Sequence, residues 1–319
     1  MSLALTRRKL TQLVKDRGQA LGFDLVGISR AAFLEAEAPD LELWLRKGLH
    51  GSMSYMSNYF DKRLDPRLLV PDARSVISVI HNYFPGPETR QPDGAPLISR
   101  YAWGEDYHTV LKTKLFRLYQ ELAEAAGTEV NGRVFVDSAP VMDKAWARRG
   151  GLGWIGKHTN LITPRRGSYF FIGEIILDLE LDYDGPVRDY CGTCTRCLDA
   201  CPTGALTPYQ IDASRCISYL TIELKEEIPA DFQAQLAGWA YGCDICQEVC
   251  PWNRFSKPHP GGEFAPLPHV SFTARDWQEI TRPVFNRLAR RSAMSRIRWP
   301  KLQQNIRAVL GDTSPMPDA

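Results

Sequence analysis

Apolar and polar positions alternate along the first third of the chain in patterns that predict both helices and strands. Thr6–Leu21 carries apolar residues at helical intervals, which is typical of an amphipathic helix, and residues 31–47 repeat that pattern. Phe23–Ser29 and the β-branched run Ser75–His81 predict strands, the second of them buried. Residues 85–96 are rich in proline, glycine and aspartate and predict a surface loop.

The same alternation continues to about residue 185. Asp106–Ala126 and Met142–Arg149 have helical spacing, and Arg133–Val136 predicts a short strand between them. Leu161–Thr163 and Phe170–Asp178 predict two strands that form a hairpin. Helices that alternate with strands indicate an α+β or α/β domain.

Three regions follow from these patterns and from the distribution of cysteines. Residues 1–185 contain the alternating elements and form the predicted catalytic domain, and residues 186–262 contain every cysteine. Residues 263–319 form a basic, mostly helical tail, in which Pro283 and Pro300 are expected to break the helices.

Eight cysteines lie between Cys191 and Cys250 and carry the clearest chemical signal of the chain. The first four follow a C-x2-C-x2-C-x3-C-P spacing, the bacterial ferredoxin pattern, in which the fourth cysteine binds the other of two clusters. The spacing therefore predicts two [4Fe–4S] clusters in a ferredoxin-like domain. We expect one to be bound by Cys191, Cys194, Cys197 and Cys250, and the second by Cys201, Cys216, Cys243 and Cys246.

Structural zinc and disulfide bonds are the alternatives for these cysteines. The thiolates of the first run are packed too densely for one tetrahedral ion. Disulfides are typical of short secreted chains, and the opening residues reach charge at Arg7 before an apolar signal-peptide core forms. Both points favour iron–sulfur clusters in a cytoplasmic protein.

Composition limits the class of protein, and the local distribution of charge adds a candidate surface. Of 319 residues, 44% are hydrophobic and 24% charged, as in an ordinary globular protein, and no apolar run is long enough to span a bilayer. The net charge of +2 hides a basic block, residues 282–307, that contains no acidic residue. This block predicts either a phosphate-contacting surface or a solvated helical face. The candidate contacts are Arg287, Arg290, Arg291, Arg296, Arg298 and Lys301.

Residues 151–156 match the G-x-G-x-x-G spacing of dinucleotide-binding loops. That loop needs a strand before it and a helix after it, and here the predicted order is reversed. We therefore expect a tight loop that lets Lys157 and His158 approach a large ligand.

Several longer motifs are more specific than any of these features. They are residues 51–56, residues 99–108, Asp137-Ser-Ala-Pro140, residues 147–157, Glu174 in Gly173-Glu-Ile, and both cysteine sets. With these motifs the chain resembles the epoxyqueuosine reductases, the QueG family of cobalamin-dependent tRNA-modifying enzymes, from about residue 5 to about residue 310. Many members carry a further helical extension, and we expect it to be absent here because the chain ends soon after Gly311.

The resemblance implies an α+β fold: an α/β cobalamin-binding domain similar to nitroreductases and reductive dehalogenases, a ferredoxin-like domain with two [4Fe–4S] clusters, and a short helical tail. It also implies reduction of the epoxide of epoxyqueuosine at the wobble position of tRNA to give queuosine, with electrons passing from the clusters to cobalamin. The expected partners are a tRNA anticodon stem-loop and a low-potential electron donor of the flavodoxin or ferredoxin type. We expect a monomer that does not associate with membranes.

The resemblance assigns site residues as well. Asp137 matches the family's acid, which protonates the oxygen as the epoxide opens, and such an acid needs a pKa raised by burial. Its ordinary alternative role is to cap the following helix. The residues expected around cobalamin are Arg100, Tyr101, Asp137, Lys157, His158 and Ser218.

No histidine is expected to bind the cobalt. A cobalamin-binding D-x-H-x-x-G motif begins at Asp106 and His108 but has Leu111 in place of the glycine. This agrees with the family, whose cobalamin is base-off without a protein ligand.

Two other classes of protein fit parts of the sequence. A cytoplasmic reductive dehalogenase would share the cobalamin and the clusters, although the exported members carry a twin-arginine leader, and Arg7-Arg8 lacks its apolar stretch. A ferredoxin-like electron-transfer protein would not need the long domain that precedes the first cysteine.

Overall fold

A four-stranded antiparallel sheet forms the centre of the protein, whose computed structural model describes residues 5–311. Its strands lie in the order β1 (Leu25–Arg30), β2 (Ser75–Asn82), β7 (Phe170–Leu177) and β4 (Gly132–Phe135). The β-branched run in β2 is buried, as the sequence predicted, because this strand is central in the sheet. Since every neighbouring pair is antiparallel, the fold is α+β and the sheet is not doubly wound.

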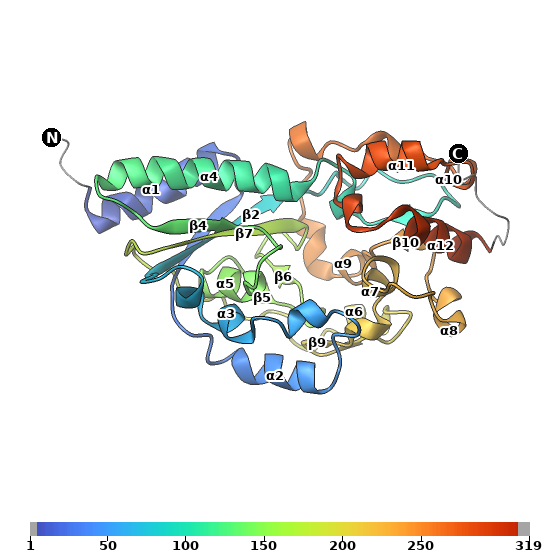
Figure 1. Ribbon diagram of the computed structural model, residues 1–319, viewed down its shortest axis with the longest axis horizontal. Coiled ribbons are helices and arrows are strands. Elements are labelled where there is room, and N and C mark those ends of the chain that lie inside the picture. The colour runs from blue at the N-terminus through green and yellow to red at the C-terminus, as the bar shows by residue number, and fades with distance from the viewer. Residues whose placement is uncertain (1–4, 312–319) are drawn as a thin grey trace.

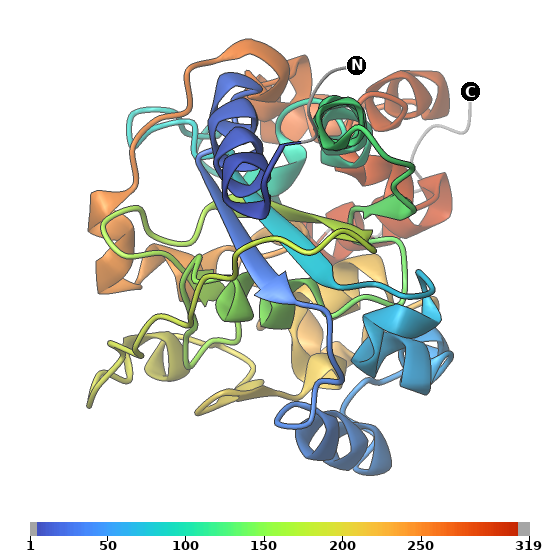
Figure 2. The ribbon, with the colours of Figure 1, turned by 90° about the vertical axis from the view of Figure 1, so that its left-hand side faces the viewer.

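Helices cover both faces of this sheet (Figure 1). α1 (Arg7–Ala20) and α4 (Tyr107–Ala126) lie on one face, and α5 (Asp143–Arg149) lies on the other, as Figure 2 shows. Asp106 caps the first turn of α4 with its carboxylate, and Gly127 ends the helix with a positive φ. Within residues 5–311, no helix has both the length and the apolar character needed to cross a membrane.

The helix predicted over residues 31–47 is shorter than expected. Only α2 (Ala38–Arg46) is helical, and α3 (Phe60–Leu64) follows it. The backbone N–H groups of Ala31 and Leu34 instead donate to carbonyls of distant segments, so tertiary hydrogen bonds replace the first turns.

The predicted hairpin over residues 161–178 is also wrong. β6 (Leu161–Ile162) pairs with β5 (Trp154–Ile155), whereas β7 lies between β2 and β4. The glycine loop of residues 151–156 does run from a helix into a strand, as expected. A Cβ at Gly153 would lie 2.2 Å from the Ile162 carbonyl oxygen, so this glycine permits close packing of two backbones.

The cysteine-rich segment contains only short elements and is joined to the first domain by a strand pair. β10 (Trp239–Tyr241) pairs in parallel with β3 (Leu97–Ile98). The other elements are α6 (Arg196–Asp199), β8 (Leu206–Thr207), β9 (Gln210–Ile211), α7 (Ile217–Ile222), α8 (Ala230–Gln233) and α9 (Ile245–Glu248).

The basic tail packs into the main hydrophobic core. It forms α10 (Ala274–Gln278), α11 (Arg282–Ala289) and α12 (Trp299–Leu310), which bury side chains in the same core as α4. Pro283 and Pro300 stand in the first turns of α11 and α12, so they begin helices where the sequence predicted breaks. The last residues of the predicted tail, 312–319, lie outside the described residues.

Candidate active site

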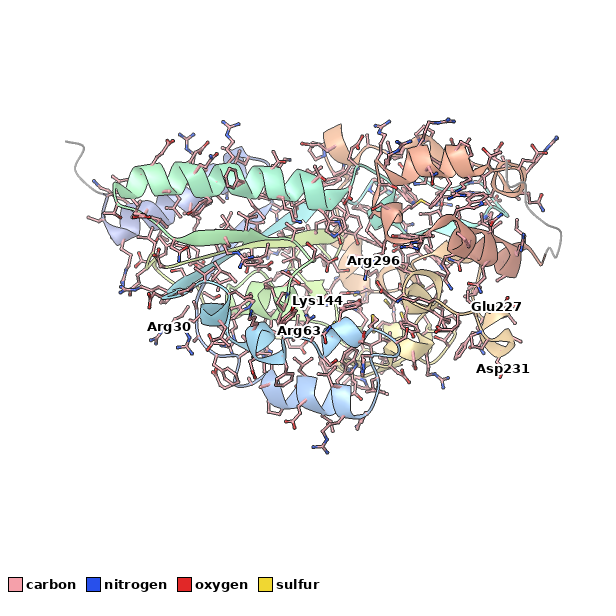
Figure 3. All side chains as sticks on the ribbon, in the orientation of Figure 1. Arg30, Arg63, Lys144, Glu227, Asp231 and Arg296 are labelled. Atoms are coloured by element: carbon pink, nitrogen blue, oxygen red, sulfur yellow. The ribbon has the colours of Figure 1, made fainter. Side chains whose placement is uncertain are left out.

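A cavity of about 490 Å³ lies between the sheet domain and the cysteine-rich segment. Its walls combine aromatic side chains with a few polar groups, which is typical of a cofactor pocket. The sheet domain contributes Tyr101, Tyr107, Asp137, Asp143, Lys144, His158 and Phe171, among others. Lys144 lies near the middle of the molecule, below the sheet (Figure 3).

The cysteines of the second predicted cluster form part of this wall. We call Cys201, Cys216, Cys243 and Cys246 the inner set, because all four line the cavity. Burial raises the pKa of Cys243 and Cys246 well above that of a free thiol, and neighbouring thiols of the set raise it further. Such thiols ionise readily only when a metal replaces their protons, so this donor set fits a metal cluster.

The other four cysteines, which we call the outer set, do not line the cavity: Cys191, Cys194, Cys197 and Cys250. Burial raises the pKa of Cys197 to about 11, and the other three members of the set add to it. The indole N–H of Trp154 donates to Sγ of Cys191 over 3.4 Å. The ammonium of Lys157 donates to the carbonyls of Gly192 and Cys194, at 2.7 and 3.0 Å, and so holds the loop of the outer set.

Asp137 follows β4 in a left-handed backbone conformation, with φ of 53°. Residues other than glycine rarely adopt this conformation, and those that do cluster at functional sites. Its Oδ2 accepts a hydrogen bond from the Tyr107 hydroxyl at 2.5 Å and lies 3.6 Å from Nε2 of His108. On its other side His108 contacts Asp106, whose Oδ1 is 2.7 Å from Nδ1. Because α5 begins only at Asp143, Asp137 does not cap it.

The charges in this network differ from those that the sequence predicted. The pKa of Asp137 lies below its ordinary value, mainly because His108 donates a hydrogen bond to it. The sequence-based prediction that this pKa is raised is therefore wrong for this arrangement. Burial opposes the protonated form of His108, but hydrogen bonds to Asp106 and Asp137 outweigh it and raise the pKa to about 9. At neutral pH the proton therefore lies on His108, and Asp137 is ionised.

The structure brings together four of the six residues expected around a cofactor and places two elsewhere. Tyr101, Asp137, His158 and Ser218 line the cavity. Arg100 does not, because its guanidinium contacts Asp244 and Glu248, at 3.2 and 2.5 Å, and joins the first domain to α9. Lys157 instead contacts the loop of the outer set. The consecutive residues Lys157 and His158 therefore belong to two different sites, the outer set and the cavity wall.

Sequence reasoning missed three polar residues of the site. His108 and Tyr107 were considered only as part of a cobalt-ligand motif, although the Asp106 cap and the spacing in α4 place them at one helix end. Asp143 was treated as an ordinary helical residue. The sequence feature that could have identified Asp143 as a site residue is its position in the first turn of α5, five residues after Ser138.

Two family matches cover parts of this chain. Residues 190–253, which contain all eight cysteines, match the family described as "4Fe-4S double cluster binding domain". Residues 63–138 match "Epoxyqueuosine reductase QueG, DUF1730". A catabolic reductive dehalogenase aligns with a TM-score of 0.52 at 16% identity over 83% of this chain and 34% of that chain, which shows a shared fold.

Similar proteins match over nearly the whole length. The epoxyqueuosine reductase of Cellulophaga algicola is 57% identical over 303 residues, which cover 94% of this chain and 98% of that protein. A structure of Bacillus subtilis epoxyqueuosine reductase, with its catalytic aspartate loop swung out of the active site, aligns with a TM-score of 0.86 at 30% identity over 95% of this chain and 81% of that one. A structure of epoxyqueuosine reductase with an epoxyqueuosine-modified tRNA stem loop aligns with a TM-score of 0.84 at 31% identity, with the same coverage. This chain therefore belongs to the epoxyqueuosine reductase family of oxidoreductases, and it carries that family's iron–sulfur double-cluster domain.

Proposed function

We propose that this protein removes the epoxide oxygen of epoxyqueuosine at the wobble position of tRNA, giving queuosine, with cobalamin bound in the cavity. The observation that carries the proposal is that Asp137 and all four inner cysteines line one cavity. A ligand in that cavity would have access both to a proton donor and to a source of single electrons.

The residues of the cavity fit a corrinoid. Nε2 of His158 is buried, and it has no hydrogen-bond partner within residues 5–311. Burial lowers the pKa of His158 to about 4, so the neutral ring can pair with an amide side chain of the corrin. Tyr101, His158 and Ser218 would hold the cofactor, and the aromatic wall offers flat apolar surface. When bound, cobalamin would supply a reducible cobalt centre beside the inner set.

Proton supply follows from the Asp137 network. Removing an epoxide oxygen as water leaves a carbon–carbon double bond and consumes two electrons and two protons, both of which bind to the oxygen. In the resting state His108 holds a proton 3.6 Å from the carboxylate of Asp137. His108 passes this proton to Asp137, which donates it to the oxygen as the C–O bond breaks. Tyr107 keeps the carboxylate oriented through its hydroxyl.

The two cysteine sets suggest where an electron donor binds. The inner set faces the cavity, whereas Tyr190, which precedes the outer set, is 49% exposed. The exposed guanidinium groups of Arg188 and Arg196 flank the loop of the outer set. A low-potential carrier of the flavodoxin or ferredoxin type would meet the outer set at this surface, provided that it presents acidic groups.

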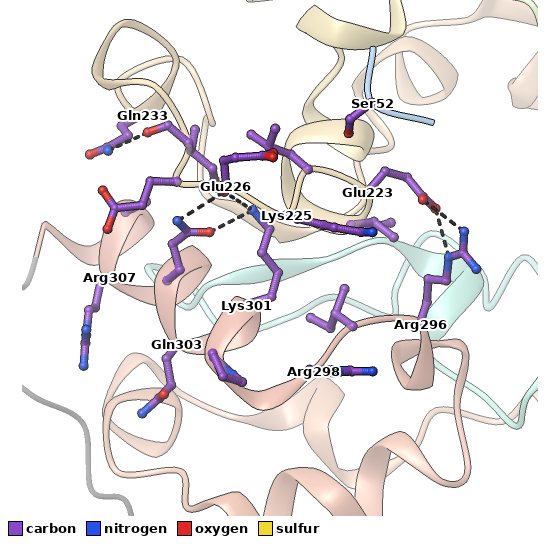
Figure 4. Close-up of a pocket in the computed structure, with 18 of the residues that line it drawn as sticks. Ser52, Glu223, Lys225, Glu226, Gln233, Arg296, Arg298, Lys301, Gln303 and Arg307 are labelled. Carbon is purple, nitrogen blue, oxygen red and sulfur yellow. Dashed lines mark hydrogen bonds and ion pairs between the residues drawn. The ribbon is translucent and has the colours of Figure 1, made fainter. Parts of the chain in front are cut away.

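An open groove next to the tail suggests how tRNA is held (Figure 4). Its volume is about 1440 Å³, and its basic lining residues are Lys225, Arg296, Arg298, Lys301 and Arg307. Only Arg296, Arg298 and Lys301 of the six candidate residues in the basic block line it. Arg291 instead forms an ion pair with Glu105. Arg296 pairs with Glu223 at 2.9 Å.

The groove leads toward the cavity. Ser52, Met53, Ser54 and Tyr55 form part of its wall, and α7 borders both spaces, with Ile222 on the groove and Ser218 on the cavity. Tyr55 is 40% exposed and offers a ring on which a loop base can stack. We therefore infer that cations in the groove contact phosphates while an unstacked base passes Tyr55 toward Asp137.

The function is tested with cluster-loaded protein under anaerobic conditions. The protein is mixed with cobalamin, a one-electron reductant and an anticodon stem-loop that contains epoxyqueuosine. We expect queuosine by mass spectrometry of the nucleosides, dependent on cobalamin. Failure to convert the stem-loop, with clusters and cobalamin both bound, would contradict the proposal.

A further inference from the structure

Glu174 is a wholly buried acidic residue of the central sheet. It lies on β7 with 0% exposure, opposite Ser78 of β2 and Phe135 of β4. Within residues 5–311, neither of its carboxyl oxygens has a hydrogen-bond donor, and the hydroxyl of Ser78 has no partner. An ionised carboxylate is strongly unfavourable in such a place, so Glu174 must carry a proton or share one.

Asp143 is the group with which Glu174 can share a proton. It begins α5, which packs against β2 and β7, and its carboxyl lies within hydrogen-bonding reach of Glu174. Its Oδ1 is buried and has no donor in the described part of the chain. Two carboxyl groups can form a hydrogen bond only when one of them is protonated, so this contact requires a proton between them.

The charged groups around the pair leave that proton in place. Arg63 of α3 and Lys144 of α5 are the cations that face Asp143, and Asp137 adds a negative charge on the cavity side. Both cations donate hydrogen bonds to backbone carbonyls elsewhere. Burial, aided by the carboxylate of Asp143, raises the pKa of Glu174 well above its ordinary value.

We propose that Glu174 and Asp143 hold one proton between them and that this proton moves to Asp137 during the reduction, so that Asp137 is protonated a second time. This rests on the proposed function, which needs two protons on one oxygen while the His108–Asp137 pair holds only one. Asp143 lines the same cavity as Asp137, so the shared proton has a short route to the carboxylate.

The two protons and two electrons of the reaction are then accounted for. Asp137 gives the first proton to the epoxide oxygen as the first C–O bond breaks. The shared proton then moves from the Glu174–Asp143 pair to Asp137 and on to the same oxygen, which leaves as water when the second C–O bond breaks. Two electrons come from the external one-electron donor through the reduced clusters, and His108 and the Glu174–Asp143 pair each regain one proton from solvent. Glu174 and Asp143 are therefore positioning residues that act through Asp137.

Infrared spectroscopy tests the shared proton without substrate or cobalamin. Cluster-loaded protein at neutral pH should show the carbonyl stretch of a protonated carboxyl group, shifted in heavy water. Glu174→Gln should remove this band, because the amide can donate to an ionised Asp143. Asp143→Asn should only move it, because Glu174 stays buried and protonated. The exposed Glu129→Gln is the matched control and should leave the band unchanged.

Kinetics tests the second protonation of Asp137. Glu174→Gln should lower kcat on the stem-loop by about 10²-fold, at the lower end of general acid–base effects, and the loss should grow with pH as solvent protons become scarcer. KM should change little, because the pair does not touch the tRNA.

Each outcome separates the two proposals. If the band is absent from the unsubstituted protein, or persists in Glu174→Gln, the shared proton does not exist. If the band behaves as expected but Glu174→Gln has the kcat and pH profile of Glu129→Gln, the pair is structural and does not protonate Asp137. If the unsubstituted protein does not convert epoxyqueuosine, the proposed function fails while the infrared result on the pair stands.

Discussion

The cavity and the groove lie on neighbouring parts of the molecule but are built from different kinds of residue. The cavity is lined by aromatic rings, thiols and a few carboxyl groups, and the carboxylate of Asp137 is held by a short hydrogen bond from the Tyr107 hydroxyl. The groove is about three times larger in volume, at 1440 against 490 Å³, and carries five cations on long side chains beside the three glutamates Glu223, Glu226 and Glu227. The first arrangement suits chemistry on a held group, whereas the second suits binding of a phosphate backbone.

Because of this difference, we expect the two regions to respond differently to substitution. A change in the cavity removes a reacting or electron-transferring group, so it should lower kcat on every substrate. A change in the groove alters only interactions outside the reacting centre, so it should raise KM for tRNA. Four predictions follow this division, from the largest effect to the smallest.

The largest effect is expected from the inner set. Cys246→Ser should abolish turnover and lower the iron content from about eight atoms per chain to about four, because one [4Fe–4S] cluster is lost. Cys194→Ser, in the outer set, should lose the same amount of iron. It should retain some turnover with a small chemical reductant that can reach the inner cluster directly. Equal turnover by the two variants with that reductant would show that the sets do not differ in their access to the cavity.

Asp137→Asn is expected to have the next largest effect. Turnover should fall about 10²–10⁴-fold, the usual range for loss of a general acid, while cluster content and cobalamin binding remain. The resting proton lies on His108, whose raised pKa is about 9, so kcat of the unsubstituted enzyme should decline as the pH rises above that value. His108→Asn should remove this alkaline limb. A variant Asp137→Asn with full activity would assign the acid to another residue.

Charge reversal in the groove should have a moderate effect confined to tRNA. Arg298→Glu together with Arg307→Glu should raise KM for the stem-loop and reduce the slope of log affinity against log salt by roughly 0.7 for each phosphate that is no longer neutralised. Turnover on the free nucleoside should barely change. Arg290→Glu is the matched control, because Arg290 belongs to the basic block but does not line the groove. If the control behaves like the double variant, the whole basic face binds tRNA and the groove has no special role.

The smallest effect concerns stability. Glu174 has a pKa raised by burial, so the folded protein keeps a proton that the unfolded chain releases above the ordinary value of 4.5. The folded state then binds more protons than the unfolded state, and stability falls as the pH rises above that value. Glu174→Gln removes this loss, so it should raise the free energy of unfolding more at pH 8 than at pH 5. Denaturant unfolding at pH 5 and pH 8 measures it, and an equal effect at both pH values would contradict the assignment.

Sequence patterns predicted the parts of the fold that depend on local periodicity. The buried run of β2 and the amphipathic α4 were recognised because their own side chains define a face. The pairing of β6 with β5 was not, because two-residue strands have no period and their partner is chosen by the close packing at Gly153.

The candidate site divides in the same way. Thiol spacing predicted the division of the eight cysteines into two sets, but only the structure shows that the inner set lines the cavity. The charge state of Asp137 was not predictable, because it depends on His108, 29 residues earlier in the sequence, and on the hydroxyl of Tyr107. Lys157 and His158 are adjacent in sequence, yet only the three-dimensional structure shows that they serve different places.

The most direct test of the account is the mass of the nucleoside formed in heavy water. Cluster-loaded protein with cobalamin and a one-electron reductant should convert epoxyqueuosine in the stem-loop to a product that has lost one oxygen atom and carries no solvent deuterium on carbon. This is expected because both protons of the reaction bind to the departing oxygen. A product that retains the oxygen, or that contains deuterium bound to carbon, would contradict reductive deoxygenation at this cavity.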